Sequence, residues 1–155
     1  MGYSVRGNET SKVKDRVAKY CVGLGLDLGC GNVKVSDDAI GVDYEKFAEA
    51  ASVIIDLSKE NALRMFSNES MDFVFSSHLL EDFPNTKETL TEWCRVIKPG
   101  GYLILYVPDK SIYPKHGTRG ASPYHKVDLG IDDIENILCN FGGWKIISAV
   151  VHNEY

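Results

Sequence analysis

The chain of 155 residues lacks several features that mark special classes of protein. None of its four cysteines belongs to a Cys-x-x-Cys pair, so the sequence does not support a zinc finger, a thioredoxin-like centre or a secreted disulfide framework. No stretch of about eighteen apolar residues occurs, and no apolar region follows the amino terminus, which argues against a membrane span and a secretion signal. We therefore expect a reduced, cytoplasmic protein without a metal site.

Basic residues are also too few and too scattered to form a nucleic-acid surface. Lys and Arg number 17 against 22 Asp and Glu, which gives a formal net charge of −5. No basic run could neutralise a row of phosphates, so we expect neither nucleic acid nor a membrane as a partner. With 44% hydrophobic residues the chain is long enough to bury a core, and we expect a single domain.

Short apolar runs that alternate with amphipathic segments predict the fold class. Strands are expected at 25–28, 39–43, 52–56, 71–77, 102–107 and 144–151. Helices are expected at 11–20, 58–66, 86–97 and 131–141. This alternation indicates an α/β, Rossmann-like fold with a mostly parallel sheet and helices on both faces.

Glycines directly follow the first predicted strand. In the segment Asp27-Leu28-Gly29-Cys30-Gly31 they permit unusual dihedral angles and let a ligand approach the backbone. Ligands of such sheets bind beyond the carboxyl ends of the strands. A dinucleotide fingerprint needs a third glycine where Lys34 stands, and no Walker lysine pattern exists, so a nicotinamide site and a P-loop are not supported. A glycine turn without a ligand stays an alternative.

Four motifs, in order and spacing, resemble those of the class I S-adenosylmethionine-dependent methyltransferase family. Residues 27–31 are similar to motif I of that family, and residues 41–43 to its acid-tipped second strand. Residues 72–81 resemble the fourth-strand motif, and residues 95–101 the junction before the fifth strand. The resemblance covers residues 20–110 and is strongest to the small-molecule, type 11 branch, which methylates metabolites, lipids, quinones and sugars.

The resemblance implies that the chain binds S-adenosylmethionine and releases S-adenosylhomocysteine. Asp43 would accept hydrogen bonds from both ribose hydroxyls, because carboxylate oxygens accept side by side. Asp56 would take the exocyclic amine of adenine, although either acid could instead cap a helix. The full set of implied cofactor-binding residues is Asp27, Gly29, Cys30, Gly31, Asp43, Tyr44, Asp56, Leu57 and Ser77.

The implied reaction is the in-line transfer of a methyl group to a small-molecule or glycan acceptor. Residues 110–130 form a long segment rich in glycine and proline, which we expect to be a loop on the substrate side. A hydroxyl acceptor would need a base, and the candidates are His78, Asp109, His116 and His125. We assign His78 and His125 to the catalytic site, although His125 could be a structural loop residue and His78 could simply shape the pocket.

Two departures from the family pattern bear on function. Gly31 and Asp43 are close in sequence, so the crossover between the first two strands is reduced to a turn or two. The chain also stops after its sixth predicted strand, without the family's C-terminal seventh strand. The unpaired edge favours a homodimer formed along the C-terminal edge strand. A non-catalytic S-adenosylmethionine-binding or interaction module is the alternative function.

The expected organisation is one methyltransferase-like domain spanning residues 1–155. Its predicted parts are an N-terminal helix at 1–22, a cofactor-binding core at 23–109, the substrate-side loop at 110–130, and the last helix and strand at 131–155.

Overall fold

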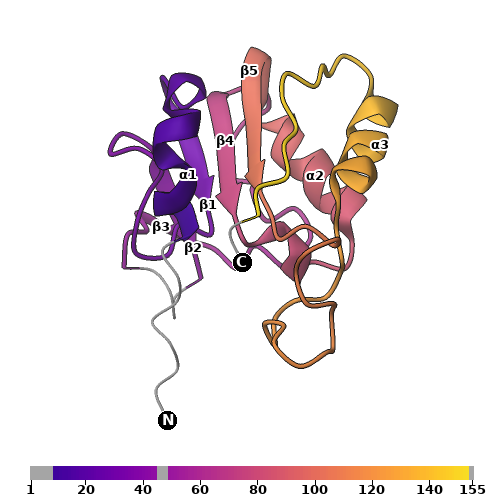
Figure 1. Ribbon diagram of the computed structural model, residues 1–155. Helices are drawn as coiled ribbons and strands as arrows, with labels where there is room; N and C mark the ends of the chain where they lie inside the picture. Colours follow the sequence, from indigo (N-terminus) through magenta and orange to yellow (C-terminus); the bar gives the residue numbers. More distant parts are fainter. Residues whose placement is uncertain (1–8, 45–48, 154–155) are drawn as a thin grey trace. The chain divides into compact units, whose positions relative to one another are not determined.

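The structure, a computed structural model, describes residues 9–44 and 49–153. The chain divides into two compact units. The first comprises Met1–Ser77 and Glu92–Tyr106, and it contains the sheet (Figure 1). The second comprises His78–Thr91 and Val107–Tyr155, and it contains the long loop and the last helix.

The first unit is built on a five-stranded sheet in the order β3-β2-β1-β4-β5, with every neighbouring pair parallel. The strands are β1 (Gly25–Leu28), β2 (Ile40–Asp43), β3 (Val53–Ile54), β4 (Met71–Ser77) and β5 (Ile97–Tyr106). The central strands β1 and β4 are buried along almost their whole length, which explains their apolar sequences. The predicted Rossmann-like α/β fold is confirmed.

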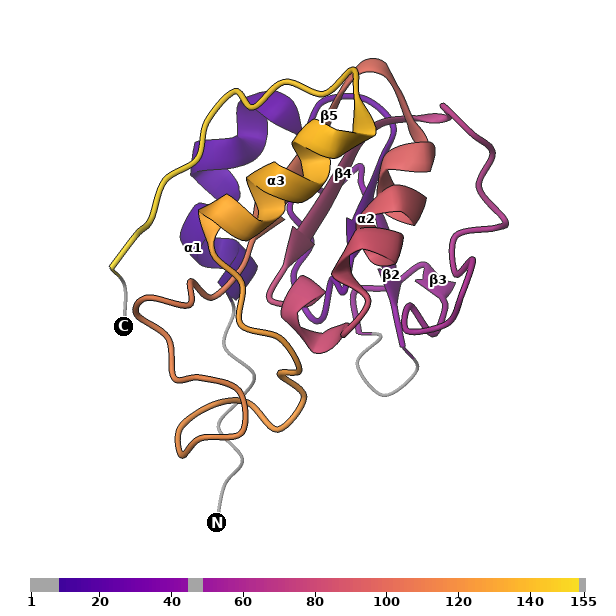
Figure 2. The same cartoon turned by 90° about the vertical axis from the view of Figure 1, so that its right-hand side faces the viewer.

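Helix α1 (Glu9–Val17) packs on one face of this sheet and continues into the 3-10 turn η1 (Ala18–Tyr20). Val13 of α1 joins Phe73 and Phe75 of β4 in a buried cluster, together with Val35 from the crossover between β1 and β2. The last turn of helix α2 (Thr86–Arg95; Figure 2) belongs to the same unit. The Trp93 side chain of this turn is buried. Alternate residues of β4 thus contribute to buried layers on both sides.

The helix predicted at 58–66 is not formed, and the segment is a series of turns. The Arg95 guanidinium donates hydrogen bonds to the carbonyls of Leu63 and Phe66, at 3.0 and 2.9 Å. Within the segment the N–H groups of Arg64 and Phe66 donate to the carbonyls three residues before them, at 3.0 and 2.8 Å, so the backbone forms separate tight turns. The prediction was wrong because the spacing of apolar residues does not distinguish such turns from an α-helix.

Two predicted boundaries also move at the junction before β5. Helix α2 ends at Arg95, earlier than predicted, and β5 begins at Ile97 instead of residue 102. Ile97 pairs with Met71, and a register shift follows before Phe73 pairs with Tyr102. This irregularity lets the Lys-Pro-Gly-Gly segment belong to the strand.

The second unit holds the predicted long loop between β5 and helix α3 (Ile131–Phe141). The loop is closed at its base by a parallel bridge between Asp109 and Leu129, and the Lys110 N–H donates to the Leu129 carbonyl at 2.8 Å. The Lys110 ammonium binds Asp132 and Asp133 in the first turn of α3, at 3.0 and 2.8 Å. The unit also contains the 3-10 turn η3 (Leu80–Asp82).

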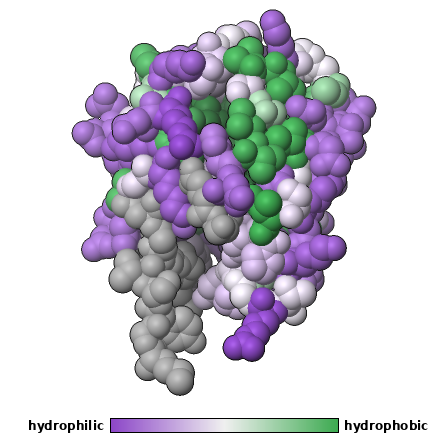
Figure 3. All heavy atoms as spheres, in the orientation of Figure 1, coloured by the Kyte–Doolittle hydropathy of each residue, from purple (hydrophilic) through white to green (hydrophobic). Residues whose placement is uncertain are grey.

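The strand predicted at 144–151 is not formed. Residues 144–153 have no regular secondary structure, and Ile147 and Val150 are 59% and 61% exposed. Figure 3 shows that apolar residues gather in places on one face of the molecule. A strand needs a neighbour for its hydrogen bonds, which a β-branched composition does not supply by itself. Within the described ranges the sheet therefore has five strands, and β5 is an edge strand.

Three further observations concern the whole described part of the chain. Its four cysteines are all free. It contains no group of three or more side chains arranged to hold a metal ion. None of its helices is long and apolar enough to cross a bilayer.

Candidate cofactor-binding site

The predicted cofactor-binding residues follow the carboxyl ends of four neighbouring strands. Parallel register places Leu28 opposite Val42 and Ser76, and Asp43 opposite Ile54. The Ser76 hydroxyl donates to the Leu28 carbonyl at 3.1 Å, which joins the ends of β1 and β4. Because all the strands run in the same direction, the segments that follow them meet at one edge of the sheet.

The glycine turn after β1 is hydrogen-bonded to the end of β2. Gly29 and Gly31 have φ angles of +72° and +54°, a left-handed conformation that strains other residues. The Gly29 N–H donates to the Val42 carbonyl at 2.8 Å, and the Gly31 N–H donates to Asp43 Oδ2 at 2.7 Å. A Cβ atom at Gly31 would meet no neighbouring group within 4 Å, so the backbone is open to a ligand here.

Asp43 is buried at the end of β2 beside this open backbone. Its Oδ2 accepts the hydrogen bond from Gly31, and its Oδ1 accepts one from the Tyr44 N–H at 2.7 Å. A carboxylate has about four lone-pair sites, which can accept hydrogen bonds from hydroxyl groups. The Tyr44 side chain is exposed. The arrangement fits the ribose of a nucleoside.

Asp27 is fully buried and supports the crossover after β1. Its Oδ2 accepts the Val35 N–H at 2.6 Å, while its Oδ1 has no hydrogen-bond partner in the described structure. Burial raises the pKa of Asp27 from 3.8 to about 7; the Val35 hydrogen bond opposes this rise and the Asp43 charge adds to it. The crossover was predicted to keep a helical turn or two at residues 32–38, but it contains only turns and bends, and Asp27 holds it in place.

Cys30 is a buried, inert part of the glycine turn. Burial raises the pKa of its thiol to about 12, and the charges of Asp27 and Asp43 add to the effect. The thiol is therefore protonated at neutral pH, where a protonated thiol is a poor nucleophile. Its sulfur would lie 2.9 Å from a Cβ placed at Gly41, so it fills the space under β2.

Asp56 and Leu57 follow β3, close to the end of β2. The Ile55 N–H donates to the Asp43 carbonyl at 3.0 Å, which places this segment next to Asp43. Asp56 accepts hydrogen bonds from both the side chain and the backbone N–H of Ser58, and these lower the pKa of Asp56 below 3.8. Asp56 is therefore ionised at neutral pH and caps a turn, since no helix follows it. Leu57 is buried.

Ser77 and His78 stand at the end of β4. Ser77 is buried, and its hydroxyl has no hydrogen-bond partner among residues 9–44 and 49–153. His78 has a φ of +50°, which turns the chain sharply after the strand. Its Nδ1 lies 3.8 Å from Glu81 Oε1, and about a sixth of its side chain is exposed.

The other three candidate bases lie on the long loop. His125 is 3% exposed, its ring stacks on Tyr113 at 5.4 Å between centroids, and its Nε2 lies 3.3 Å from Asp128 Oδ1. Neither ring nitrogen makes a hydrogen bond of normal geometry with any described residue. Asp128 also accepts the backbone N–H of His116 at 2.8 Å. Asp109 accepts hydrogen bonds from the Ser111 N–H and hydroxyl, which caps the start of the loop.

Glu81 is a buried acid that sequence reasoning missed. It is 4% exposed, and burial raises its pKa from 4.5 to about 8. Its backbone carbonyl accepts hydrogen bonds from the N–H groups of Lys126 and Val127. The available signal was an acid placed directly after Leu80 in the apolar segment that follows β4.

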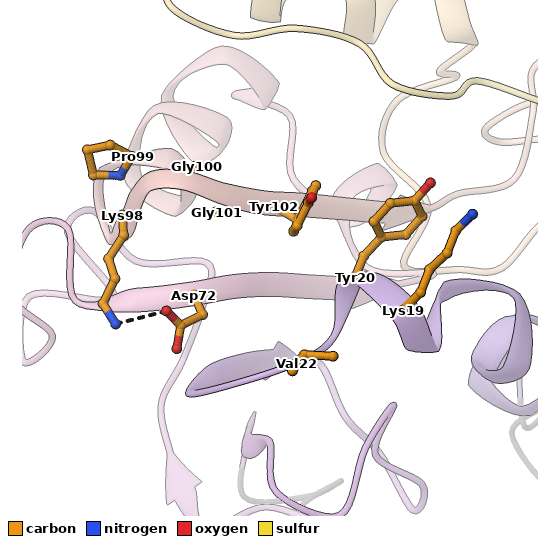
Figure 4. Close-up of a pocket in the computed structure, with 9 residues that line it drawn as sticks. All are labelled: Lys19, Tyr20, Val22, Asp72, Lys98, Pro99, Gly100, Gly101 and Tyr102. Carbon is orange, nitrogen blue, oxygen red and sulfur yellow. Dashed lines mark hydrogen bonds and ion pairs between the residues drawn. The ribbon is translucent and has the colours of Figure 1, made fainter.

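A shallow hollow of about 250 Å³ lies at the opposite edge of the sheet. It is at the amino ends of β4 and β5, where Lys98 Nζ binds Asp72 Oδ1 at 2.9 Å and the rings of Tyr20 and Tyr102 lie 5.0 Å apart (Figure 4). None of the predicted site residues lines it. This hollow is separate from the candidate site.

Comparison with known protein families shows where the chain belongs. Residues 26–105, just over half of the chain, match the Methyltransferase domain family. The chain therefore belongs to the class I S-adenosylmethionine-dependent methyltransferase family, as its motifs predicted.

Two curated relatives illustrate the similarity. A demethylmenaquinone methyltransferase of Shouchella clausii is 29% identical over 109 residues, covering 70% of this chain and 43% of the relative. A probable S-adenosylmethionine-dependent methyltransferase of Mycolicibacterium smegmatis is 23% identical over 139 residues, covering 81% of this chain and 54% of the relative. The chain spans about half the length of these relatives.

Solved structures share the fold. An S-adenosylmethionine-dependent methyltransferase from Archaeoglobus fulgidus aligns with a TM-score of 0.67 at 21% identity, covering 86% of this chain and 68% of the other. One from Aquifex aeolicus aligns with a TM-score of 0.58 at 18% identity, covering 87% of this chain and 84% of the other. At these identities the similarity concerns the fold.

Proposed function

We propose that the chain binds S-adenosylmethionine beyond the carboxyl ends of β1, β2 and β3 and transfers its methyl group to a small-molecule or glycan acceptor. The observation that carries the proposal is the open backbone at Gly31 beside the buried carboxylate of Asp43. The Gly31 backbone lets a ligand approach closely, and the Asp43 carboxylate offers acceptors for hydroxyl groups. Membership of the methyltransferase family supports this assignment.

Different site residues would contact different parts of the cofactor. The backbone at Gly29 and Gly31 would contact the methionine part, Asp43 the ribose hydroxyls, and Asp56 with Leu57 the adenine. When bound, S-adenosylmethionine supplies a methyl group on a positively charged sulfur, which a nucleophile displaces in line. The main task of the chain is then to align the reactants, and alignment can be worth about 7–11 kcal/mol.

A base would be needed for a hydroxyl acceptor, and His78 is the stronger of the two predicted catalytic histidines. It directly follows Ser77 and keeps part of its side chain exposed. His125 is almost completely buried against Tyr113, which favours a role in holding the loop. The acceptor itself is proposed to be a metabolite or glycan; the demethylmenaquinone methyltransferase among the relatives is named for a quinone substrate.

A non-catalytic S-adenosylmethionine-binding module is the second candidate. It is favoured by the two-residue β3 and by the absence of a strand at 144–151 within the described ranges. Binding without turnover across a panel of hydroxyl, amine and carbon acceptors would support this module. Turnover of any of these acceptors would exclude it.

Calorimetry with two matched variants tests the cofactor site. Asp43→Ala leaves the ribose donors and the Gly31 N–H without an acceptor, so S-adenosylmethionine should bind about 1–3 kcal/mol more weakly. Asp38→Ala changes an exposed acid on the same crossover and should bind like the wild type. Unchanged affinity of a folded Asp43→Ala variant would remove Asp43 from the site, and no binding by the wild type would overturn both functions.

We also propose that two copies associate and that the protein works in the cytoplasm. The predicted C-terminal edge strand is not formed, so we place the association on β5 instead. β5 is an edge strand within the described ranges, and an open edge can pair with another chain. The exposed apolar side chains of residues 146–151 are available for such an association. The four free cysteines fit a reducing compartment, and the charge of −5 argues against a nucleic-acid partner.

A further inference from the structure

Glu81 connects two segments of the second unit. Its backbone carbonyl accepts the N–H groups of Lys126 and Val127 at 2.8 and 3.1 Å, which ties η3 to the loop segment directly after His125. Its side chain is buried, and Oε2 has no hydrogen-bond partner in the described part of the chain. A buried carboxyl group with an unused oxygen destabilises a fold, so its presence calls for a reason.

The imidazole of His78 is a titratable group close to Glu81. The two residues are three positions apart on one turn, and Oε1 lies 3.8 Å from Nδ1. This is longer than a hydrogen bond, but at this distance the charge of a carboxylate still acts on the ring nitrogen.

The charge of Glu81 determines what this contact does to His78. A neutral imidazole carries one proton, on Nδ1 or on Nε2. A carboxylate at this position favours the proton on Nδ1, which leaves Nε2 unprotonated. A protonated carboxyl group presents its O–H to Nδ1 and favours the proton on Nε2.

We infer that Glu81 is a positioning residue that selects which ring nitrogen of His78 carries the proton. When Glu81 loses its proton to solvent, the single ring proton of His78 moves from Nε2 to Nδ1, and the net change is the release of one proton. Because burial raises the pKa of Glu81 to about 8, this change falls in a range suited to measurement. The inference deepens the proposed function, and only its catalytic consequence rests on that function. The consequence is that His78 can act as a base at Nε2 only when its ring proton is on Nδ1.

Several titratable or charged groups lie on the turn that contains Glu81 and on the segments bonded to it. Its own turn and the two segments joined to it carry the following titratable or charged groups: Asp82, His78, His125, Lys126 and Asp128. Of these, only the Asp82 charge contributes to the raised pKa of Glu81.

Nitrogen-15 NMR of the imidazole rings tests the inference without cofactor or acceptor. The chain has four histidines, and His78→Gln identifies the signals of His78. In the wild type, the ratio of the Nδ1–H form to the Nε2–H form of His78 should rise several-fold between about pH 7 and about pH 9.5. In Glu81→Gln this ratio should not change with pH. The control Glu88→Gln, an exposed acid in the same unit, should follow the wild type.

A constant ratio for His78 in the wild type would overturn the inference, and so would a Glu81→Gln variant that follows the wild type. The wild-type series alone suffices if Glu81→Gln does not fold. Because no ligand is involved, failure of S-adenosylmethionine to bind in calorimetry would overturn the proposed function and leave the tautomer result standing.

Discussion

Replacing Asp27 with asparagine should change how the stability of the protein depends on pH. Burial raises the pKa of Asp27 from 3.8 to about 7 in the folded protein, whereas the unfolded chain keeps the ordinary value. Between these two values the native state binds a proton that the unfolded state has lost. The stability contributed by this group is therefore complete below pH 3.8 and is lost as the pH rises to about 7.

The size of the effect follows from the interval of pH over which the two states differ. From about pH 5 to about pH 7 the native state keeps the proton, and each pH unit costs about 1.4 kcal/mol, so the loss is about 3 kcal/mol. Asparagine has the same shape, and its carbonyl oxygen can still accept the Val35 N–H, but it carries no charge. The unfolding free energy of Asp27→Asn relative to the wild type should rise by about 3 kcal/mol between about pH 5 and about pH 8.5.

Urea denaturation at these two pH values, followed by circular dichroism, measures this difference. Glu81 also titrates in this range, but it is present in both proteins, so its contribution cancels. Asp38→Asn, an exposed acid on the same crossover, is the control and should show no such change. If Asp27→Asn and the wild type lose the same stability between the two pH values, the argument that Asp27 is a costly buried acid is wrong.

Two glycines and the carboxyl-terminal segment give further tests. Gly31→Ala adds a Cβ to open space at a φ of +54°, so it should cost about 1–2 kcal/mol of stability and weaken S-adenosylmethionine binding in calorimetry; wild-type affinity would contradict the open-backbone site. Gly25→Ala puts a Cβ 2.2 Å from the Phe73 ring and should instead unfold at a much lower urea concentration. Sedimentation velocity should show a dimer at high concentration that Ile147→Lys weakens, and a monomer at every concentration would contradict self-association.

The central strands were predictable because burial on both faces leaves a direct mark on the sequence. β1 and β4 are apolar runs, and both formed where they were expected. β3 is shorter than predicted, since Val53 and Ile54 alone pair with β2. Local composition therefore located the strands well but did not determine how many residues find a partner.

The two elements that were predicted wrongly depend on distant partners. Residues 58–66 have helical spacing, but they form tight turns, and Arg95 donates hydrogen bonds to the carbonyls of Leu63 and Phe66 from 32 and 29 residues away. The run at 144–151 has strand composition, but no neighbouring strand pairs with it in the described structure. The spacing of apolar residues indicates which side chains a segment can bury. It does not indicate which hydrogen bonds the segment makes to residues far along the chain.

The candidate site also has features that the sequence predicts and features that it does not. The glycines after β1 and the acid after β2 have roles that follow from residue type and position along a strand, so the sequence alone brought Gly31 and Asp43 together. The environments of Asp27 and Glu81 depend on burial by residues far along the chain. Their raised pKa values could not be predicted from the segments around them.

The short crossover explains why both acids matter beyond ligand binding. A helix after β1 would satisfy the N–H groups beyond its first turn internally, but here two acidic side chains accept N–H groups of the crossover, Asp43 from Gly31 and Asp27 from Val35. Each acid therefore shapes the turn that is proposed to hold the cofactor, and the Asp43 charge adds to the cost of ionising Asp27. Truncation of either side chain removes an acceptor and a charge together. Asp27→Asn keeps the acceptor, so it separates the electrostatic role of this acid from its structural one.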